Sequence, residues 1–214
     1  QSWANINLNA STGFILLREN NLDYKFSYAK IKLKIRKNNF IINKAKFEKD
    51  KLHYSIEDVE IDGSNYRIKK AMLFKDNKLQ YALKDTVIKN QFIKNGLLNV
   101  KNNKEFSNYL RKNFNIDIIG DTEFNFRLTG DISNLDLNLK LNSDLTDSDL
   151  KINYLNLIKK KNIKSSIKTE IIYQKGKLTF IRDINLIIEN HNYKIGTVKL
   201  DGIAPTQILL RNIK

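Results

Sequence analysis

The chain has 214 residues, of which 41% are hydrophobic and 29% are charged, which is enough for one large all-β unit or two small domains with a buried core. Only one proline is present, which argues against a disordered linker, and the lack of cysteine excludes a disulfide framework and thiol catalysis. The formal net charge of +15 has two readings. One is an anionic partner, either nucleic acid or a membrane surface, and the other is a solvated sheet face in a composition rich in Lys, Asn and Ile.

Neither a signal peptide nor a run of about 18 apolar residues is present in the sequence. The chain begins with Gln1 and is already alternating at Trp3, Ile6 and Leu8. We therefore expect a segment of a longer protein, whose membrane anchor would lie elsewhere in the parent.

The first hundred residues alternate between apolar and polar side chains, the period of half-buried strands. Asn20-Asn21 and Asp62-Gly63 predict turns, and Gly96 predicts a break in the less regular stretch 87–98. The predicted strands carry the apolar residues Ile31, Leu33, Ile35, Tyr54, Ile56, Val59, Ile61, Tyr66, Ile68, Leu79, Tyr81 and Leu83.

Residues 103–114 have a different period. Phe106, Tyr109, Leu110 and Phe114 lie three, four and eight residues apart, on one face of a helix of about three turns. Asn102 or Asn103 can cap its start. This predicted helix either packs on the sheet as a lid or lies on a membrane surface.

Alternation then returns, and it is strictest from Leu135 to Leu141, where four leucines alternate with Asp136, Asn138 and Lys140. Gly130-Asp131 and Lys175-Gly176 predict turns, and residues 142–149 predict a polar connection. Large apolar residues at alternate positions would share one face of the sheet, and they are the candidate contacts for lipid acyl chains: Phe124, Phe126, Leu128, Leu135, Leu137, Leu139, Leu141, Ile152, Ile167 and Ile171.

Turn signals every 8–14 residues predict a sequential antiparallel meander. Each large apolar side chain left in water would cost roughly 1.5–3 kcal/mol, so the apolar face must be covered. A second sheet, closure of the sheet on itself, or curling into an open groove filled by lipid chains would each cover it. We favour the open groove, as one segment over residues 1–214 with a possible sub-boundary near 100–116.

A block of sequence also resembles a known family. It consists of Asn142–Leu150 (Asn-Ser-Asp-Leu-Thr-Asp-Ser-Asp-Leu), then Leu155–Lys160, and then the hairpins of Ser165–Leu178 and Ile184–Gly202. It resembles the AsmA-like family, particularly the YhdP and TamB type, over about residues 106–210. The tryptophan or proline that usually precedes the lysine is absent from Asn156–Ile158.

The resemblance implies a repeating β-groove in the periplasm of a Gram-negative envelope. Its parent would be anchored in the inner membrane and would conduct phospholipid towards the outer membrane. The partners implied are phospholipid acyl chains and neighbouring repeats of the same chain at both ends.

Few residues suggest bond-making chemistry. Asp144, Asp147 and Asp149 lack the glycine and glutamate spacing of a calcium loop and favour a solvated turn with Asx caps. His53 and His191 stand alone, and Lys159–Lys161 predicts a charged loop or a contact with lipid head groups. We expect no catalytic site, no metal and no cofactor.

Two other functions remain open. One is a structural β-sandwich module of a surface or envelope protein, which a closed and fully packed interior would favour. The other is a basic nucleic-acid-binding domain, which the charge and the aromatic residues Tyr24, Phe26 and Tyr28 favour. Basic residues spread along the whole chain argue against it, as expected of solvated strand faces.

Overall fold

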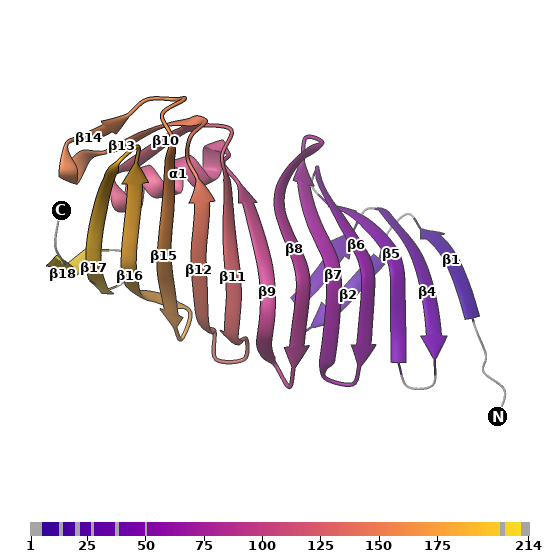
Figure 1. Cartoon of the computed structure of the whole chain (residues 1–214). Coiled ribbons are helices and arrows are strands. Elements are labelled where there is room, and N and C mark those ends of the chain that lie inside the picture. The colour runs from indigo at the N-terminus through magenta and orange to yellow at the C-terminus, as the bar shows by residue number, and fades with distance from the viewer. Residues whose placement is uncertain are drawn as a thin grey trace. The chain divides into compact units, whose positions relative to one another are not determined.

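The computed structural model describes the backbone of residues 6–12, 15–19, 22–26, 28–36, 39–49, 51–201 and 204–210. Within these residues the chain is an antiparallel β-meander with one α-helix, which confirms the predicted fold class. It forms two compact units, residues 1–98 and 99–214, and the main sheet of each is open and curled (Figure 1). The predicted turn at Asn20-Asn21 lies outside the described residues.

Unit 1 is a sheet of sequential hairpins with a separate two-stranded ribbon. The strand order of the sheet is β1-β4-β5-β6-β7-β8, and the ribbon is the hairpin β2-β3, whose second strand contacts β5. β9, Phe92–Lys101, contains the division between the units. The other bounds are β1 Ile6–Thr12, β2 Ile15–Glu19, β3 Leu22–Phe26, β4 Tyr28–Arg36, β5 Asn39–Lys49, β6 Leu52–Asp62, β7 Asn65–Lys75 and β8 Lys78–Lys89.

The sequence predicts a turn at Gly63 and a break at Gly96, both in unit 1. Gly63 lies in the β6–β7 turn with φ +55°, which confirms the Asp62-Gly63 hairpin. The break predicted at Gly96 is wrong, because Gly96 is buried inside β9. A Cβ at that position would lie 2.9 Å from Thr86 Oγ1, so the glycine permits a close approach of β9 to Thr86.

Three strands contain an aspartate in the left-handed conformation. Asp58 in β6, Asp85 in β8 and Asp183 in β16 have φ values of +47°, +45° and +50°. At Asp183 the pairing of β15 with β16 shifts register, as in a β-bulge. A bulge bends its strand and increases the local twist, and the short polar side chain of Asp tolerates positive φ better than most.

Unit 2 has two layers. Its main sheet has the order β11-β12-β15-β16-β17-β18, and a smaller sheet has the order β10-β13-β14. The bounds are α1 Lys104–Phe114, β10 Ile116–Gly120, β11 Glu123–Asp131, β12 Asp136–Asp144, β13 Ser148–Ile152, the 3₁₀ turn η1 Asn153–Leu155, β14 Leu157–Lys159, β15 Ser165–Gln174, β16 Lys177–Ile188, β17 His191–Asp201 and β18 Ala204–Leu210.

Helix α1 forms where the sequence predicts it. The Asn103 side chain accepts a hydrogen bond from the Phe106 amide at 2.8 Å, and Asn115 ends the helix in the left-handed conformation with φ +53°. Glu105 in the first turn and Arg111 and Lys112 in the last complement the helix dipole. Of the two cap candidates, Asn103 is therefore the cap.

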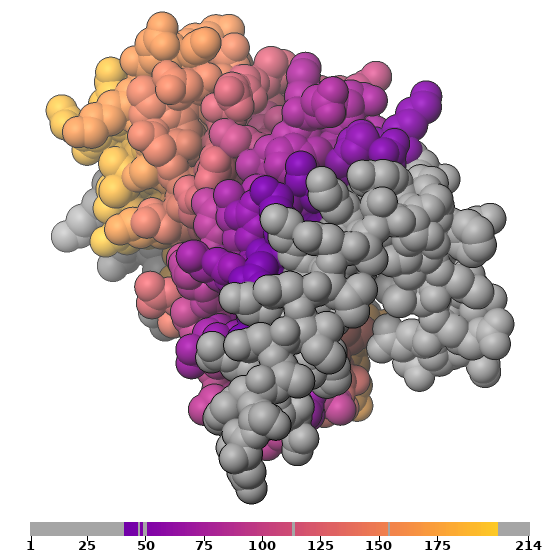
Figure 2. Space-filling model, turned by 90° about the vertical axis from the view of Figure 1, so that its right-hand side faces the viewer, coloured from indigo at the N-terminus to yellow at the C-terminus, as the bar shows by residue number. Residues whose placement is uncertain are grey.

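Helix α1 and the small sheet lie over one face of the main sheet, and we call them together the cover layer (Figure 1). The Phe106 ring packs against Phe124 of β11 with ring centroids 5.0 Å apart. In Figure 2 the atoms of β13 and β14, in orange, form the top of unit 2. The predicted packing of the helix on the sheet is confirmed. Among the described residues, none of the helical segments has the length and apolar character that crossing a membrane requires.

Candidate functional site

One face of the main sheet of unit 2 carries nearly all the predicted contact residues. The pairing register aligns them in rows that run across the strands. The inner row is Phe126–Leu141–Thr169, and the outer row is Leu128–Leu139–Ile171–Ile181–Val198.

The two rows differ in burial. Phe126, Leu141 and Thr169 are 8%, 9% and 9% exposed, and Phe124 beyond them is 3% exposed, because the cover layer packs against this part of the sheet. All five residues of the outer row are only half-buried, as are Leu137 and Tyr173, which pair with each other one step further along the strands. The cover layer therefore leaves a band of large apolar side chains partly accessible.

The outer row crosses five neighbouring strands, β11, β12, β15, β16 and β17. At about 4.8 Å between strands it is about 19 Å long. Its members are all aliphatic, so the row offers a ligand non-directional burial and no hydrogen bond from a side chain.

The predictions for Leu135 and Ile152 are wrong in their placement. Leu135 lies in the turn before β12 with φ +53° and is 50% exposed, so it does not share the strand face of Leu137. The side chain of Asp131 caps this turn by accepting hydrogen bonds from the Ser133 and Asn134 amides. Ile152 ends β13 in the small sheet, where it pairs with Ile116 and Leu157.

The opposite face of the main sheet is polar, as the alternation predicts. Lys140 and Glu170 face each other across β12 and β15 with a 3.8 Å ion pair, and Asn138 Nδ2 donates to Glu170 Oε1 at 2.7 Å. Apolar residues also occur on this face: Ile172, which pairs with Asn138, and Phe180 and Ile187 of β16, which pair with Ile172 and Ser166. The contrast in polarity between the two faces is clearest on β12, where Leu137, Leu139 and Leu141 alternate with Asn138 and Lys140.

Lys159 is buried at the junction of the two layers, and the prediction that it belongs to a charged loop is wrong. It is the last residue of β14 and 1% exposed. Its ammonium donates to the carbonyl oxygens of Leu145, Thr146 (3.0 Å) and Ser148 (2.6 Å). Burial lowers the pKa of this ammonium, and the charges of Asp149, Asp144 and Asp147 partly offset the effect.

These contacts join two segments that are close in the sequence. Lys159, at the end of β14, binds the main chain of the connection 145–147, where Leu145 is also buried at 1% exposure. The connection is further tied by Leu145 N–H donating to Ser165 O (2.9 Å) and by Asn162 N–H donating to Thr146 O (2.8 Å).

The acidic cluster forms the predicted turn. Asp144 accepts hydrogen bonds from the hydroxyl and the amide of Thr146, and these lower the pKa of its carboxyl group, the hydroxyl having the larger effect. In the parts of the chain that the structure describes, no group of three His, Cys, Asp or Glu side chains is placed to hold a metal ion.

A pair of phenols lies at the far end of the apolar face. Tyr109 of α1 lies near Tyr173 of β15, and burial, followed by the nearness of the Tyr109 phenol, raises the pKa of Tyr173. Tyr109 also packs edge-on against Phe114, with ring centroids 5.9 Å apart. The helical spacing predicted that Tyr109 faces the sheet, but its partner across the layers could not be identified from sequence.

The main sheet of unit 1 has comparable rows of its own. Ile56, Ala71 and Leu83 pair in sequence across β6, β7 and β8, and all three are half-buried. The same three strands align Val59, Ile68 and Thr86, of which Val59 and Thr86 are buried. An apolar face therefore recurs in both units.

Two features of unit 2, the burial of Lys159 and the small sheet, could not be predicted from the sequence. Lys159 was hidden in a run of three lysines, although its position two residues after Leu157 fits the alternation of a strand. Only α1 of the cover layer could be predicted, since strands of a small sheet have the same period as strands of a large one.

Comparison of the chain with protein-family models, with curated proteins and with solved structures found no match.

Proposed function

We propose that the chain is a non-enzymatic segment that binds and conducts lipid, with the outer row of unit 2 as its acyl-chain contact. The observation that carries the proposal is the set of five aliphatic side chains, aligned in register across five strands and left half-exposed. A continuous apolar band of this kind on a soluble protein is typical of an interaction or ligand site.

An aliphatic wall holds an acyl chain and lets it move. Each CH₂ group removed from water contributes about 0.8 kcal/mol, whichever part of the wall covers it. Because the row has no side-chain hydrogen-bonding group, displacement along it exchanges one apolar contact for an equivalent one. A lipid can thus be retained against water and still slide from strand to strand.

The setting follows from the resemblance to the AsmA-like family. On this proposal the chain belongs to a longer periplasmic protein anchored in the inner membrane. It passes phospholipid between the two membranes of a Gram-negative envelope, and neighbouring repeats of the same chain extend the apolar face at both ends.

A structural β-sandwich module is the second candidate. It is favoured by the inner row, where Phe126, Leu141 and Thr169 are buried beneath a second layer as in a packed sandwich core. The two candidates differ in the outer row, which a lipid-binding protein uses and a structural module does not.

The test compares two neighbours on one strand. Ile171→Asp places a charge in the outer row, and Ile172→Asp places the same charge on the opposite face of β15. Binding of a phosphatidylglycerol with a fluorescent acyl chain is measured for the purified chain and both variants. If the charge removes two CH₂ groups from contact, Ile171→Asp raises Kd about fifteenfold, the equivalent of about 1.6 kcal/mol, while Ile172→Asp leaves it unchanged.

A photo-crosslinking amino acid at Leu139 gives the direct readout, with Asn138 on the opposite face as its control. Lipid adducts at Leu139 and not at Asn138 support the proposal. Absence of adducts at both positions, together with global unfolding when Leu137 and Leu139 are both replaced by Asp, would indicate a packed sandwich and exclude the groove.

A further inference from the structure

The polar face of the main sheet of unit 2 carries more cations than carboxylates. Each of the five strands β11, β12, β15, β16 and β17 contributes one exposed cation to two neighbouring rows on this face. Glu170 lies within these rows and Asp183 lies beside them in the bulge of β16, so five cations face two carboxylates and the surplus is three positive charges. We call them the basic rows: Arg127–Lys140–Glu170–Arg182–Thr197 and Asn125–Asn142–Lys168–Asn185–Lys194.

The cations of the basic rows have few partners within the protein. Lys140 forms a 3.8 Å ion pair with Glu170, and its side chain nevertheless remains 67% exposed. In the described part of unit 2, no carboxylate forms an ion pair with Arg127, Lys168 or Lys194. The surplus charge of this face is therefore left to be balanced by ions in solution or by an anionic partner.

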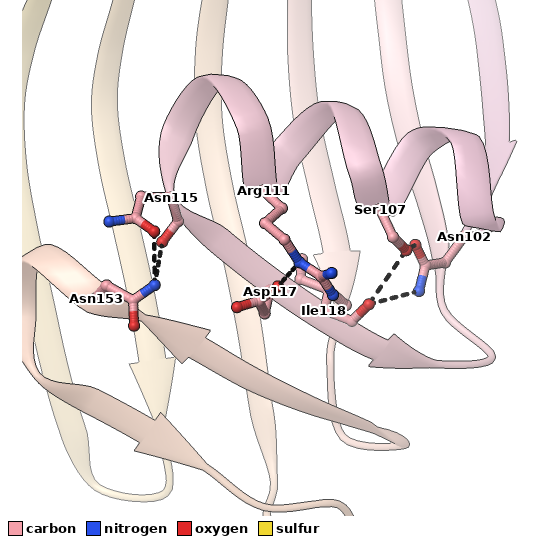
Figure 3. A network of polar contacts seen from close by, with 7 residues as sticks. All are labelled: Asn102, Ser107, Arg111, Asn115, Asp117, Ile118 and Asn153. Atoms are coloured by element: carbon pink, nitrogen blue, oxygen red, sulfur yellow. Dashed lines mark hydrogen bonds and ion pairs between the residues drawn. The ribbon is translucent and has the colours of Figure 1, made fainter.

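Other cations of unit 2 are held by groups of the protein itself. Arg111 of α1 points toward Asp117 of β10 and forms an ion pair with it (Figure 3). Lys101 Nζ lies 3.1 Å from Glu123 Oε2, and the Lys159 ammonium donates to main-chain carbonyls. The basic rows have few such contacts, so their cations contribute little to holding the fold together.

The corresponding face of unit 1 differs in this respect. Glu57 of β6 lies between Lys44 of β5 and Lys70 of β7, with ion pairs of 3.8 and 3.9 Å. Glu60 of β6 forms an ion pair with Arg67 of β7 at 3.7 Å. Three cations of that face are thus matched by carboxylates on the next strand, whereas in the basic rows only Lys140 is matched in this way.

We propose that the basic rows dock unit 2 on the head groups of an anionic lipid bilayer. Among the described side chains of this face Phe180 is the one aromatic residue, and the Arg182 guanidinium already lies over its ring, 4.9 Å from the centroid. Single-stranded nucleic acid is bound through free aromatic rings on which its bases stack. Lipid head groups need only the exposed cations, so they are the anionic partner that fits this face.

Docking through the basic rows leaves the apolar outer row free, because the two lie on opposite faces of the same strands. The inference therefore goes beyond the proposed function and does not depend on it. The basic rows cross five strands and are about 19 Å long, so all five cations can contact one bilayer surface at the same time.

Two double variants with the same change in charge test the docking. Lys168→Gln with Lys194→Gln removes two cations from the basic rows, and Lys151→Gln with Lys160→Gln removes two exposed lysines from the cover layer. The measurement is binding of the full chain to sedimented vesicles. One set of vesicles contains equal parts of phosphatidylglycerol and phosphatidylcholine, and the other contains phosphatidylcholine alone.

We expect the chain to bind the anionic vesicles and not the neutral ones. Binding should be lost as the salt concentration rises from about 0.1 to 1 M, since the Debye length falls from about 10 to 3 Å. Removal of the two lysines of the basic rows should weaken vesicle binding about thirtyfold, which is about fivefold for each lysine. The cover-layer variant should stay within about twofold of the wild type, because its lysines lie on the other side of the sheet.

Three results would overturn the docking. They are equal binding to both kinds of vesicle, an equal loss in the two double variants, and capture of a single-stranded oligothymidylate in place of the vesicles, which would assign the basic rows to nucleic acid. Ile171→Asp separates this inference from the proposed function, because it should weaken binding of the fluorescent lipid and leave vesicle docking unchanged. Failure of either measurement leaves the other conclusion standing.

Discussion

Replacing Lys159 with Met tests whether the buried ammonium holds the two layers of unit 2 together. Methionine keeps an unbranched apolar stem in the same space and removes the three hydrogen bonds to Leu145, Thr146 and Ser148. Two of the carbonyls keep a donor, because Ser148 Oγ donates to Leu145 O at 2.9 Å and Asn162 N–H donates to Thr146 O at 2.8 Å.

The expected loss follows from these contacts. The lowered pKa of Lys159 shows that desolvation of the ammonium outweighs the gain that is due to its charge. The variant therefore loses three hydrogen bonds of ordinary strength, which contribute about 0.5–1.5 kcal/mol each. The expected destabilisation is about 3 kcal/mol, which would lower the Tm of unit 2 by roughly 10 °C.

Urea unfolding and thermal melting of the full chain measure this loss, with Lys160→Met as the matched control. Lys160 is exposed, so its replacement should change the free energy of unfolding by no more than about 0.5 kcal/mol. Hydrogen exchange should quicken in Lys159→Met at the amides of Leu145 and Asn162, which bond within the junction. Equal stability of the Lys159→Met and Lys160→Met variants would refute the reasoning.

Three other outcomes are expected. Because the pKa of Lys159 is lowered in the folded state, the unfolded chain binds more protons between that pKa and the ordinary lysine pKa of 10.5. The unfolding free energy of the wild type relative to Lys159→Met should therefore rise as pH increases through this range in urea titrations. Asn103→Ala should destabilise the chain by about 1 kcal/mol through loss of the cap of α1, with faster amide exchange at Phe106 as its local signature. Asp58→Ala should be about 1 kcal/mol less stable than Asp58→Gly in the same unfolding assay, since both lose the ion pair with Lys69 and only alanine is strained at φ +47°.

Local patterns in the sequence predicted most of the fold. The period-two runs became strands, the three-and-four spacing of Phe106, Tyr109 and Leu110 became α1, and Asn103 became its cap. The side of each strand was also predictable, because alternation alone places Leu137, Leu139 and Leu141 on one face.

The predictions that failed concern residues whose placement depends on contacts that no local pattern reveals. Leu135 has the same alternation as Leu137, and only the Asx cap by Asp131 and the positive φ place it in a turn. Ile152 has the pattern of any strand residue, so the sequence could not assign it to the small sheet. The burial of Lys159 requires three carbonyl groups from residues 145–148, which no local pattern around a lysine run can indicate.

The left-handed aspartates allow bends in such sheets to be located from sequence. In each case the aspartate is the third residue of a four-residue pattern that begins with Ile or Leu and ends with Val, Thr or Ile. The three examples are Ile56-Glu57-Asp58-Val59, Leu83-Lys84-Asp85-Thr86 and Ile181-Arg182-Asp183-Ile184. In a long alternating chain, this four-residue pattern marks where the period of two is offset. Adding or removing it by design would change the curvature of the sheet strand by strand, and with it the width of the apolar face that a ligand meets.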